Sequence, residues 1–405
     1  MTSQSDVPAL VLGDGYTALA AVRALGRAGV NVLLAAAATG FAGRSRFVRG
    51  SISGVEETGD GVLAAVQAFG VEQAVLIPCS DGWCEAVVSL PAEARDRLAT
   101  SLPPGNVVST LLDKAALANL LRRRNVPHPR TIVLHGPADL TAMDGQPTSW
   151  ILKPRSSQRF NRAFGRKGFV VRTRPEAESR LAACAEAGQA MVLQEYLPGP
   201  ASAHVLVDGF QDRAGVARAR LARRRVRMYP PDLGDSTSGI FISLDEVAGP
   251  LRTLDELLAG LGYRGVLSAE FKLDPRDGVH KLLEVNCRPF GHFESAQRWG
   301  TNYCLMAYCD ALALPLPAVG ASPAGAQYGY VLADARALLA QYRRRELSIR
   351  GVAAGLAGTA RLPAHRDDPL PAAFHVAEAI GARLRLGPAS QEREARVGRP
   401  PAESA

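Results

Sequence analysis

Apolar and polar residues alternate over two short segments in the second half of the chain, residues 267–273 and 279–285. The intervening DPRDG is typical of a turn, so the pattern predicts a β-hairpin. A five-residue turn would pair Glu270 with Leu282, which leaves Glu284 diagonally opposite Glu270 on the same face. Two neighbouring carboxylates repel each other unless a cation lies between them, and their oxygen atoms suit Mg²⁺. The hairpin is therefore a candidate metal site, although a solvated acidic face would give the same pattern.

Two further polar residues continue this face. Asn286 and Arg288 follow Glu284 at a spacing of two, so an extended backbone points all three side chains to the same side. Cys287 lies between them, points to the opposite side and is expected in the core. The face then carries two acids, an amide and a guanidinium.

The first hundred residues follow a different pattern, in which short apolar segments alternate with amphipathic ones. The segments are 9–12, 18–28, 30–35, 61–69 and 73–78. This alternation predicts strands and helices that form a parallel sheet. Gly13, Gly15 and Ala18 approximate a dinucleotide-binding fingerprint, but the acid expected after the second strand is missing, which favours a structural turn. Ligands of such sheets bind at the carboxyl ends of the strands, so Ser80 and Asp81 are candidates for contacting a substrate amine or for capping a helix.

Two lysines in the next segment have unusual positions. Asp113 is a natural N-cap for a helix over residues 114–124, which places Lys114 against the helix dipole and indicates an anionic ligand or an exposed side chain. Lys153 alternates with Ile151 on a predicted strand, so it faces inward and needs a partner. The sequence RSSQRFNRAFGRKG follows, rich in basic residues and glycine, and it predicts a mobile flap suited to polyphosphate.

A row of arginines forms a third candidate site. Arg223, Arg225 and Arg227 alternate, so on a strand they would share one face. A solvated edge strand would carry the same charges. Binding of phosphate or of a substrate carboxylate is the functional alternative.

Composition narrows the class of protein. The chain has 405 residues, of which 47% are hydrophobic and 21% charged, enough for two or three domains. The net charge of +8 favours anionic partners, but no zinc spacing, aromatic run or basic heptad indicates nucleic acid. The six cysteines form no CxxC pair, no 18-residue apolar run occurs, and the amino terminus lacks a basic region before its apolar run. We therefore expect a cytoplasmic protein that binds neither nucleic acid nor membranes; a homo-oligomer is compatible with the sequence.

Several short motifs occur in an order that resembles the ATP-grasp superfamily. They are Asp113-Lys114, Ile-Leu-Lys153-Pro, the basic flap, Gln194-Glu195-Tyr196-Leu197-Pro-Gly and Glu270…Glu284-Val-Asn286-Cys-Arg288. The strings SRFV, LIPCSD and RMYPPDLG extend the resemblance to about residues 7–320. The chain is most similar to predicted carboxylate–amine ligases with a carbamoyl-phosphate-synthase-like ATP-grasp domain.

The resemblance implies an α/β fold with five parts. They are a Rossmann-like pre-ATP-grasp domain with a parallel sheet (1–110), an ATP-grasp small lobe with flap (111–190), a large lobe with the Mg-ATP site (191–318), a C-terminal extension (319–386) and a disordered tail (387–405). The two ATP-grasp lobes would each be α+β. No catalytic signal is present in the extension.

The same resemblance implies roles for individual residues. ATP would be bound through its phosphates by Lys114 and Lys153, through adenine by the Gln194 side chain and the backbones of Glu195 and Leu197, and through ribose by His204, an approximate match to the family position. Two Mg²⁺ ions, or Mn²⁺ in their place, would be held by Glu270, Glu284 and Asn286. The catalytic residues would be Arg288, which contacts the transferring phosphate, with Arg225 and Arg227.

The implied activity is ATP-dependent ligation of a carboxylic acid to an amine, such as an amino acid or a peptide-like molecule. The reaction would pass through an acyl phosphate and release ADP and phosphate. Two alternatives are a non-catalytic ATP-binding regulatory protein and a carboxylase of the biotin-carboxylase type.

Overall fold

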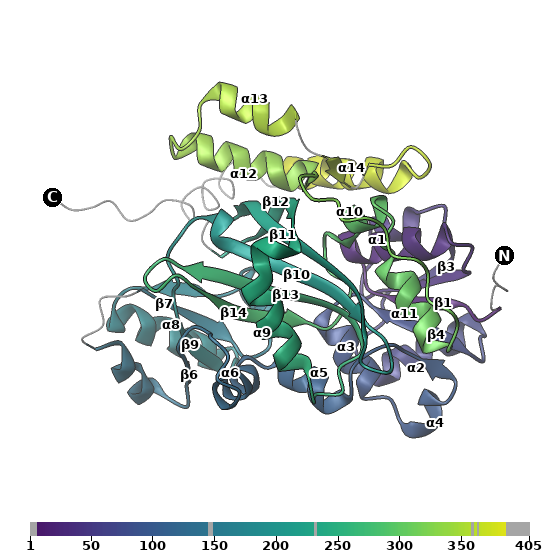
Figure 1. The fold of residues 1–405 in the computed structure, drawn as a ribbon, viewed down its shortest axis with the longest axis horizontal. Coiled ribbons are helices and arrows are strands. Elements are labelled where there is room, and N and C mark those ends of the chain that lie inside the picture. The colour runs from purple at the N-terminus through teal and green to yellow at the C-terminus, as the bar shows by residue number, and fades with distance from the viewer. Residues whose placement is uncertain (1–5, 145–148, 231–232, 358–359, 363, 386–405) are drawn as a thin grey trace.

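The computed structural model describes residues 6–144, 149–230, 233–357, 360–362 and 364–385 (Figure 1). The predicted disordered tail, 387–405, lies outside the described residues. No helix in the described ranges is long and apolar enough to span a membrane.

The amino-terminal unit is a parallel sheet with helices packed against it. Its strand order is β3-β2-β1-β4-β5. The strands are β1 (Ala9–Leu12), β2 (Val32–Ala35), β3 (Val48–Ile52), β4 (Ala74–Pro78) and β5 (Leu98–Ala99), and the helices are α1 (Gly15–Gly26), α2 (Gly59–Phe69), α3 (Asp81–Val88) and α4 (Ala92–Arg95). Every residue of β1, β2 and β4 is buried, as expected for apolar strands covered on both faces. The predicted Rossmann-like sheet is confirmed.

The second unit is a small antiparallel sheet of order β6-β9-β7-β8. Its elements and the helices around it are α5 (Gly105–Leu112), α6 (Lys114–Arg123), β6 (Thr131–Val133), β7 (Trp150–Pro154), α7 (Ser157–Phe164), β8 (Phe169–Val171), α8 (Arg174–Glu186) and β9 (Met191–Glu195). This sheet has a hydrophobic core of its own. Two features differ from expectation: β9 belongs to this sheet although the predicted boundary at 190 assigned it to the large lobe, and the flap contains the helix α7.

The third unit is a seven-stranded sheet of order β14-β13-β10-β11-β12-β15-β16. Its strands are β10 (His204–Gln211), β11 (Ala217–Tyr229), β12 (Asp235–Ile242), β13 (Gly265–Asp274), β14 (Val279–Asn286), β15 (Gln327–Tyr330) and β16 (Ala360–Leu362), and its helices include α9 (Ala248–Leu258), α10 (Phe293–Arg298) and α11 (Tyr303–Ala311). The hairpin predicted around the two glutamates is β13–β14.

The register of this hairpin differs from the predicted one. The turn comprises residues 275–278, because Asp274 pairs directly with Val279. A bulge then shifts the register after Glu270, so that Glu270 and Glu284 are directly opposite each other. The predicted diagonal placement was wrong, because sequence alternation reveals neither the turn length nor the extra residue of a bulge. The correction brings the two carboxylates closer together than expected.

The C-terminal extension is built into the rest of the molecule. It contains α12 (Val331–Arg343), α13 (Ile349–Ala357) and α14 (Leu370–Arg385), and its strand β15 joins the large sheet beside β12. Figure 1 shows α12 and α14 along the side of the molecule where α1 and α10 also lie. The guanidinium of Arg23 in α1 is buried and forms ion pairs with Glu294 of α10 and Asp368, each at 2.8 Å. The extension therefore connects the first and last parts of the chain.

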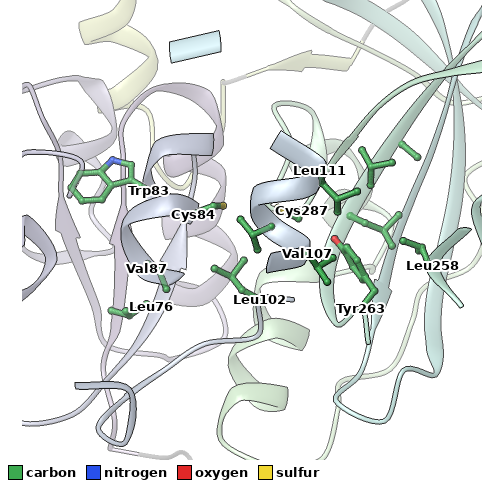
Figure 2. Close-up of a cluster of buried hydrophobic side chains, with 14 of the residues drawn as sticks. Leu76, Trp83, Cys84, Val87, Leu102, Val107, Leu111, Leu258, Tyr263 and Cys287 are labelled. Carbon is green, nitrogen blue, oxygen red and sulfur yellow. The ribbon is translucent and has the colours of Figure 1, made fainter. Parts of the chain in front are cut away.

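One hydrophobic cluster joins the amino-terminal unit to the large sheet. Figure 2 shows Trp83, Cys84 and Val87 of α3 on one side of α5 and Tyr263 and Leu258 on the other. Cys287, which follows β14, belongs to this cluster and is fully buried, so its predicted place in the core is confirmed. The cluster fixes the end of the hairpin against the amino-terminal unit.

Candidate functional site

A cleft lies between the small sheet and the large sheet. Its lining comes from β7, the flap, β9 and the segment after it, β10, β11 and the hairpin: Ile151, Lys153, Lys167, Gln194, Glu195, Tyr196, Leu197, His204, Arg225, Met228, Leu233, Gly234, Glu270, Lys272, Leu283 and Glu284. Eight of the residues predicted from the sequence are in this set. Lys114, Asn286, Arg288 and Arg227 are not, and their positions are described below.

The segment after β9 is held from both sides. The Gln194 side chain accepts a hydrogen bond from Lys153 Nζ at 2.7 Å and donates one to Thr131 Oγ1 at 3.1 Å. Glu195 forms an ion pair with Arg276 at 2.7 Å. The carbonyl of Leu197 accepts a hydrogen bond from Lys272 Nζ at 2.7 Å. These two bonds use one acceptor site and one N–H of the Gln194 amide, so the side chain keeps a second acceptor site and a second N–H for a ligand, in addition to the backbone of the segment.

Lys153 and Lys114 come from different elements and approach the same region. Alternation along β7 points Lys153 into the cleft beside Ile151, as predicted. Burial, reinforced by the positive charge of Lys114, lowers the pKa of Lys153 to about 8. Burial also lowers the pKa of Lys114, against the opposing effect of Glu284, and its ammonium donates to Ser157 Oγ at 2.8 Å. Two cations that each destabilise the other favour a bound polyanion.

Lys167 is a flap residue whose individual role the sequence did not indicate. It lines the cleft and forms an ion pair of 2.5 Å with Asp235 at the start of β12. Desolvation by the cleft acts to lower its pKa although the side chain is 53% exposed, but the charges of Asp235 and Glu284 outweigh this effect and raise the pKa. The available signal was the basic composition of the flap, which identifies the segment and not the residue.

The two hairpin acids have different environments. Glu270 accepts hydrogen bonds from Arg225 Nη2 at 2.9 Å and pairs with His204 Nδ1 at 2.5 Å. Burial acts to raise the pKa of Glu270, but Arg225 and His204 outweigh it and hold that pKa far below the usual carboxyl range. Glu284 accepts a hydrogen bond from the Asn286 amide at 3.0 Å. Glu270 is therefore held as an anion by its two partners, and Glu284 is oriented by Asn286.

The donor set of the hairpin fits Mg²⁺. Among the described residues, no group of three or more His, Cys, Asp or Glu side chains could enclose a metal ion. Mg²⁺ does not require such a cage, because it is commonly bound by one or two carboxylates together with substrate phosphates and water. Glu270 and Glu284 are opposite each other and face one cleft, which supplies two carboxylates.

Arg288 links the hairpin to the amino-terminal unit. Its Nε donates to Asp81 at 2.6 Å, and its Nη2 donates to Asn286 Oδ1 at 3.2 Å. Burial acts to lower the pKa of Arg288, but the Asp81 carboxylate outweighs it and the pKa rises.

Ser80 caps α3 by accepting a hydrogen bond from the Trp83 amide, which confirms the capping alternative for Ser80.

The three alternating arginines of β11 have separate partners. Arg223 is buried and forms a bidentate pair with Asp208. Arg225 lines the cleft, whereas Arg227 donates to both oxygens of Asp334 in α12 at 2.8 and 2.6 Å. A register shift between Arg225 and Arg227 interrupts the pairing with β12, so the expectation of one shared face does not hold for Arg227.

Comparison with known proteins places this arrangement in context. No family model matches the chain. Over 223 residues the chain is 24% identical to the D-aspartate ligase of Enterococcus faecium (strain Aus0004), and the match covers 53% of each protein. The chain thus spans about half the length of the curated relative that it matches.

Solved structures are similar over most of the chain. N5-carboxyaminoimidazole synthetase from Staphylococcus aureus, complexed with ADP, has a TM-score of 0.64 at 10% identity, covering 85% of this chain and 87% of that one. The chain has the ATP-grasp fold. The biotin carboxylase domain of Hydrogenobacter thermophilus 2-oxoglutarate carboxylase, with MgADP, ADP and bicarbonate, has a TM-score of 0.62 at 14% identity, covering 80% and 73%. In this ATP-grasp fold, the cleft lies between the small sheet and the large sheet.

Proposed function

We propose that the protein is an ATP-dependent carboxylate–amine ligase that releases ADP and phosphate. The observation that carries the proposal is the charge arrangement of the cleft, in which Glu270 and Glu284 directly oppose each other near Lys153 and Lys167. The similarity to a D-aspartate ligase supports the same class of reaction.

The chemistry explains why such a cleft suits a ligase. A carboxylate and an amine do not condense in neutral water, because the carboxylate is a poor electrophile. Transfer of the γ-phosphoryl group of ATP to the acid produces an acyl phosphate, whose carbonyl carbon an amine can attack. Positioning and electrostatic stabilisation supply most of the acceleration of such a transfer. Fixed cations and acids are therefore the groups that the protein must provide.

The residues would divide this work as follows. Lys114 and Lys153 would bind the ATP phosphates, and the backbone of Glu195 and Leu197 would bind adenine. Glu270, Glu284 and Asn286 would hold two Mg²⁺ ions, or Mn²⁺ in their place, which neutralise phosphate charge when bound.

The remaining residues would act on the acid and on the metal ligands. Arg288 would contact the transferring phosphoryl group, and Arg225 would contact the acid once Glu270 is engaged by metal. His204 would orient Glu270, to which it is hydrogen-bonded, in addition to the predicted contact with ribose. Arg227 as a catalytic residue stays a prediction, and its contact with Asp334 supports a structural role.

The test is a screen for ADP release with pairs of small carboxylic acids and amines, beginning with amino acids that include D-aspartate. ADP formed only when both substrates are present is the expected result. With hydroxylamine in place of the amine, hydroxamate and ADP should form in equal amounts.

Two variants control the assay. Glu284→Gln should be inactive, and Glu256→Gln, which removes an exposed acid of α9, should retain activity. ADP release without any acid would indicate an ATPase, and a requirement for bicarbonate would indicate a carboxylase; either result would overturn the proposal.

A further inference from the structure

His292 lies in the loop that follows Arg288 and leads into α10, and the residue is 8% exposed. The ring packs against Tyr328 and Tyr330 of β15, with ring centroids 5.1 and 4.7 Å away. Among the described residues, its Nε2 atom is buried and has no hydrogen-bond partner. A buried polar atom without a partner costs about 1–3 kcal/mol, so this nitrogen needs an explanation.

The other ring nitrogen determines the chemistry of Nε2. The ring is hydrogen-bonded to the backbone of Ser236, and this bond favours the protonated form of the ring, so the Ser236 carbonyl accepts it. Because Nε2 has no partner, Nδ1 is the donor and carries the proton of the neutral ring. Nε2 therefore holds a lone pair and is an acceptor.

One chain of hydrogen bonds and one proximity in sequence relate His292 to the cleft. The Ser236 hydroxyl accepts a hydrogen bond from Arg225 Nε at 2.8 Å, and Arg225 lines the cleft and contacts Glu270. Arg288 precedes His292 by four residues on the same loop. The imidazole is therefore connected to the cleft through Ser236 and Arg225.

The charges around His292 keep its ring neutral. The charged and titratable groups that face it are Arg223 and Arg225 from β11 and the tyrosines Tyr328 and Tyr330 from β15. Burial and the two guanidinium groups lower the pKa of His292 well below the usual histidine range. The same cations would disfavour the ammonium form of an amine bound beside the ring and favour its nucleophilic neutral form.

We propose that His292 Nε2 accepts the proton that the amine substrate loses as it attacks the acyl phosphate. Tyr328 and Tyr330 form a wall of the amine site, and the buried Tyr330 hydroxyl, which also has no partner among the described residues, offers a second polar contact. This role rests on the proposed ligase function. The class of ligand is a primary or secondary amine, because only a nitrogen that carries a proton both attacks the carbonyl and satisfies Nε2.

The step balances as follows. The nitrogen lone pair forms the C–N bond, and the bond between the carbonyl carbon and the phosphate oxygen breaks with its electron pair leaving on phosphate. One proton moves from nitrogen to Nε2 and is later released to solvent. A weak base suffices, because nitrogen becomes much more acidic once its lone pair is used in bonding.

The test uses two nucleophiles with different needs for a base. Amino groups are largely ammonium ions at neutral pH, whereas hydroxylamine is largely unprotonated and attacks without help. His292→Asn keeps a donor for the Ser236 carbonyl and removes the acceptor at Nε2. We expect ligation of the amine to fall about 100-fold or more, while hydroxamate formation and ATP binding stay close to those of the wild type.

His128→Asn is the matched control. His128 makes the same type of contact, from Nδ1 to the carbonyl of Val126 at 2.7 Å, but it belongs to the segment between α6 and β6 and not to the loop that follows Arg288. Unchanged amine ligation in His292→Asn would overturn the role, because Nε2 would then be satisfied by water alone. Equal loss of ligation and hydroxamate formation would also overturn it and would make the ring structural. Failure of the wild type to form any hydroxamate would instead overturn the ligase function on which this role rests.

Discussion

ATP affinity should depend on pH through Lys153. Burial and Lys114 lower the pKa of this lysine to about 8, so it is an ammonium ion below that pH and neutral above it. At pH 7 about nine-tenths of the free protein would carry the charge, and at pH 9 about one-tenth would. If the ammonium binds phosphate, ATP affinity should fall about tenfold between these two values.

Two substitutions at this position separate charge from shape. Lys153→Arg keeps a cation at every pH used and should flatten the dependence, leaving the contribution of Lys114. Lys153→Met should bind ATP about tenfold more weakly at pH 7, with only the pH dependence that Lys114 contributes. Calorimetric titration with Mg-ATP at half-unit steps of pH measures the ATP affinity of the wild type and of both variants. A wild-type affinity that is constant from pH 7 to 9, or an arginine variant with the wild-type slope, would refute the reasoning.

The lowered pKa of Lys153 also predicts how the stability of the folded protein changes with pH. The unfolded chain holds this proton up to a pKa of 10.5, but the folded protein releases it at about 8, so a cost to stability is present below pH 8 and disappears as the pH rises toward 10.5. That difference corresponds to about 3 kcal/mol, less about 1 kcal/mol for the hydrogen bond to Gln194. Lys153→Met should therefore increase the free energy of unfolding at pH 7 while weakening ATP binding. Urea denaturation at pH 7 measures this, and a less stable variant would contradict it.

Three further predictions concern single substitutions, the last of them with a matched control. Glu284→Gln should abolish turnover without changing the melting temperature, because the carboxylate would bind a metal ion and does not contribute to packing. Full activity of this variant would show that Glu284 is not part of the metal site. Arg288→Ala should suppress hydroxamate formation far more than ATP binding, measured by paired rate and affinity assays, since its charge is needed where negative charge develops. Asp368→Asn should destabilise the protein by about 3 kcal/mol in urea denaturation, because it leaves the buried Arg23 with one carboxylate fewer. Asp367→Asn is the control: Asp367 forms a more exposed pair with Arg27, so this substitution should change the stability by less than about 1 kcal/mol. Equal effects of these two substitutions would contradict the importance of burial.

Local alternation predicted much of the site. It placed Lys153 on the inward face of a strand and both Glu270 and Glu284 on one face of a hairpin, and the structure has these side chains in one cleft. These predictions succeeded because the period of two along a strand is a local property of the backbone. The Rossmann-like sheet was predicted for a similar reason, since fully buried parallel strands are continuous apolar runs.

Other features depend on partners far apart in the sequence. The direct pairing of Glu270 with Glu284 results from a bulge that alternation does not reveal. The partner of Arg227 is Asp334, 107 residues away, in an extension where the sequence showed no chemistry. His292 also gave no signal, because the role proposed for its Nε2 atom depends on contacts with Ser236 and with the tyrosines of β15. Such contacts arise from tertiary structure and have no periodicity of their own.

The ion pair between Arg23 and Asp368 has a consequence for synthesis of the protein. The two residues are 345 positions apart, so at roughly 5–20 residues per second the ribosome makes Asp368 about 17 to 70 s after Arg23. During this interval α1 can assemble with its sheet, but its guanidinium has neither carboxylate until Glu294 is made and lacks Asp368 until the end of the interval, so it must stay hydrated. The amino-terminal unit therefore cannot complete its packing while it is the only part of the chain made, and a nascent chain stalled before residue 368 should be unusually sensitive to proteases at α1.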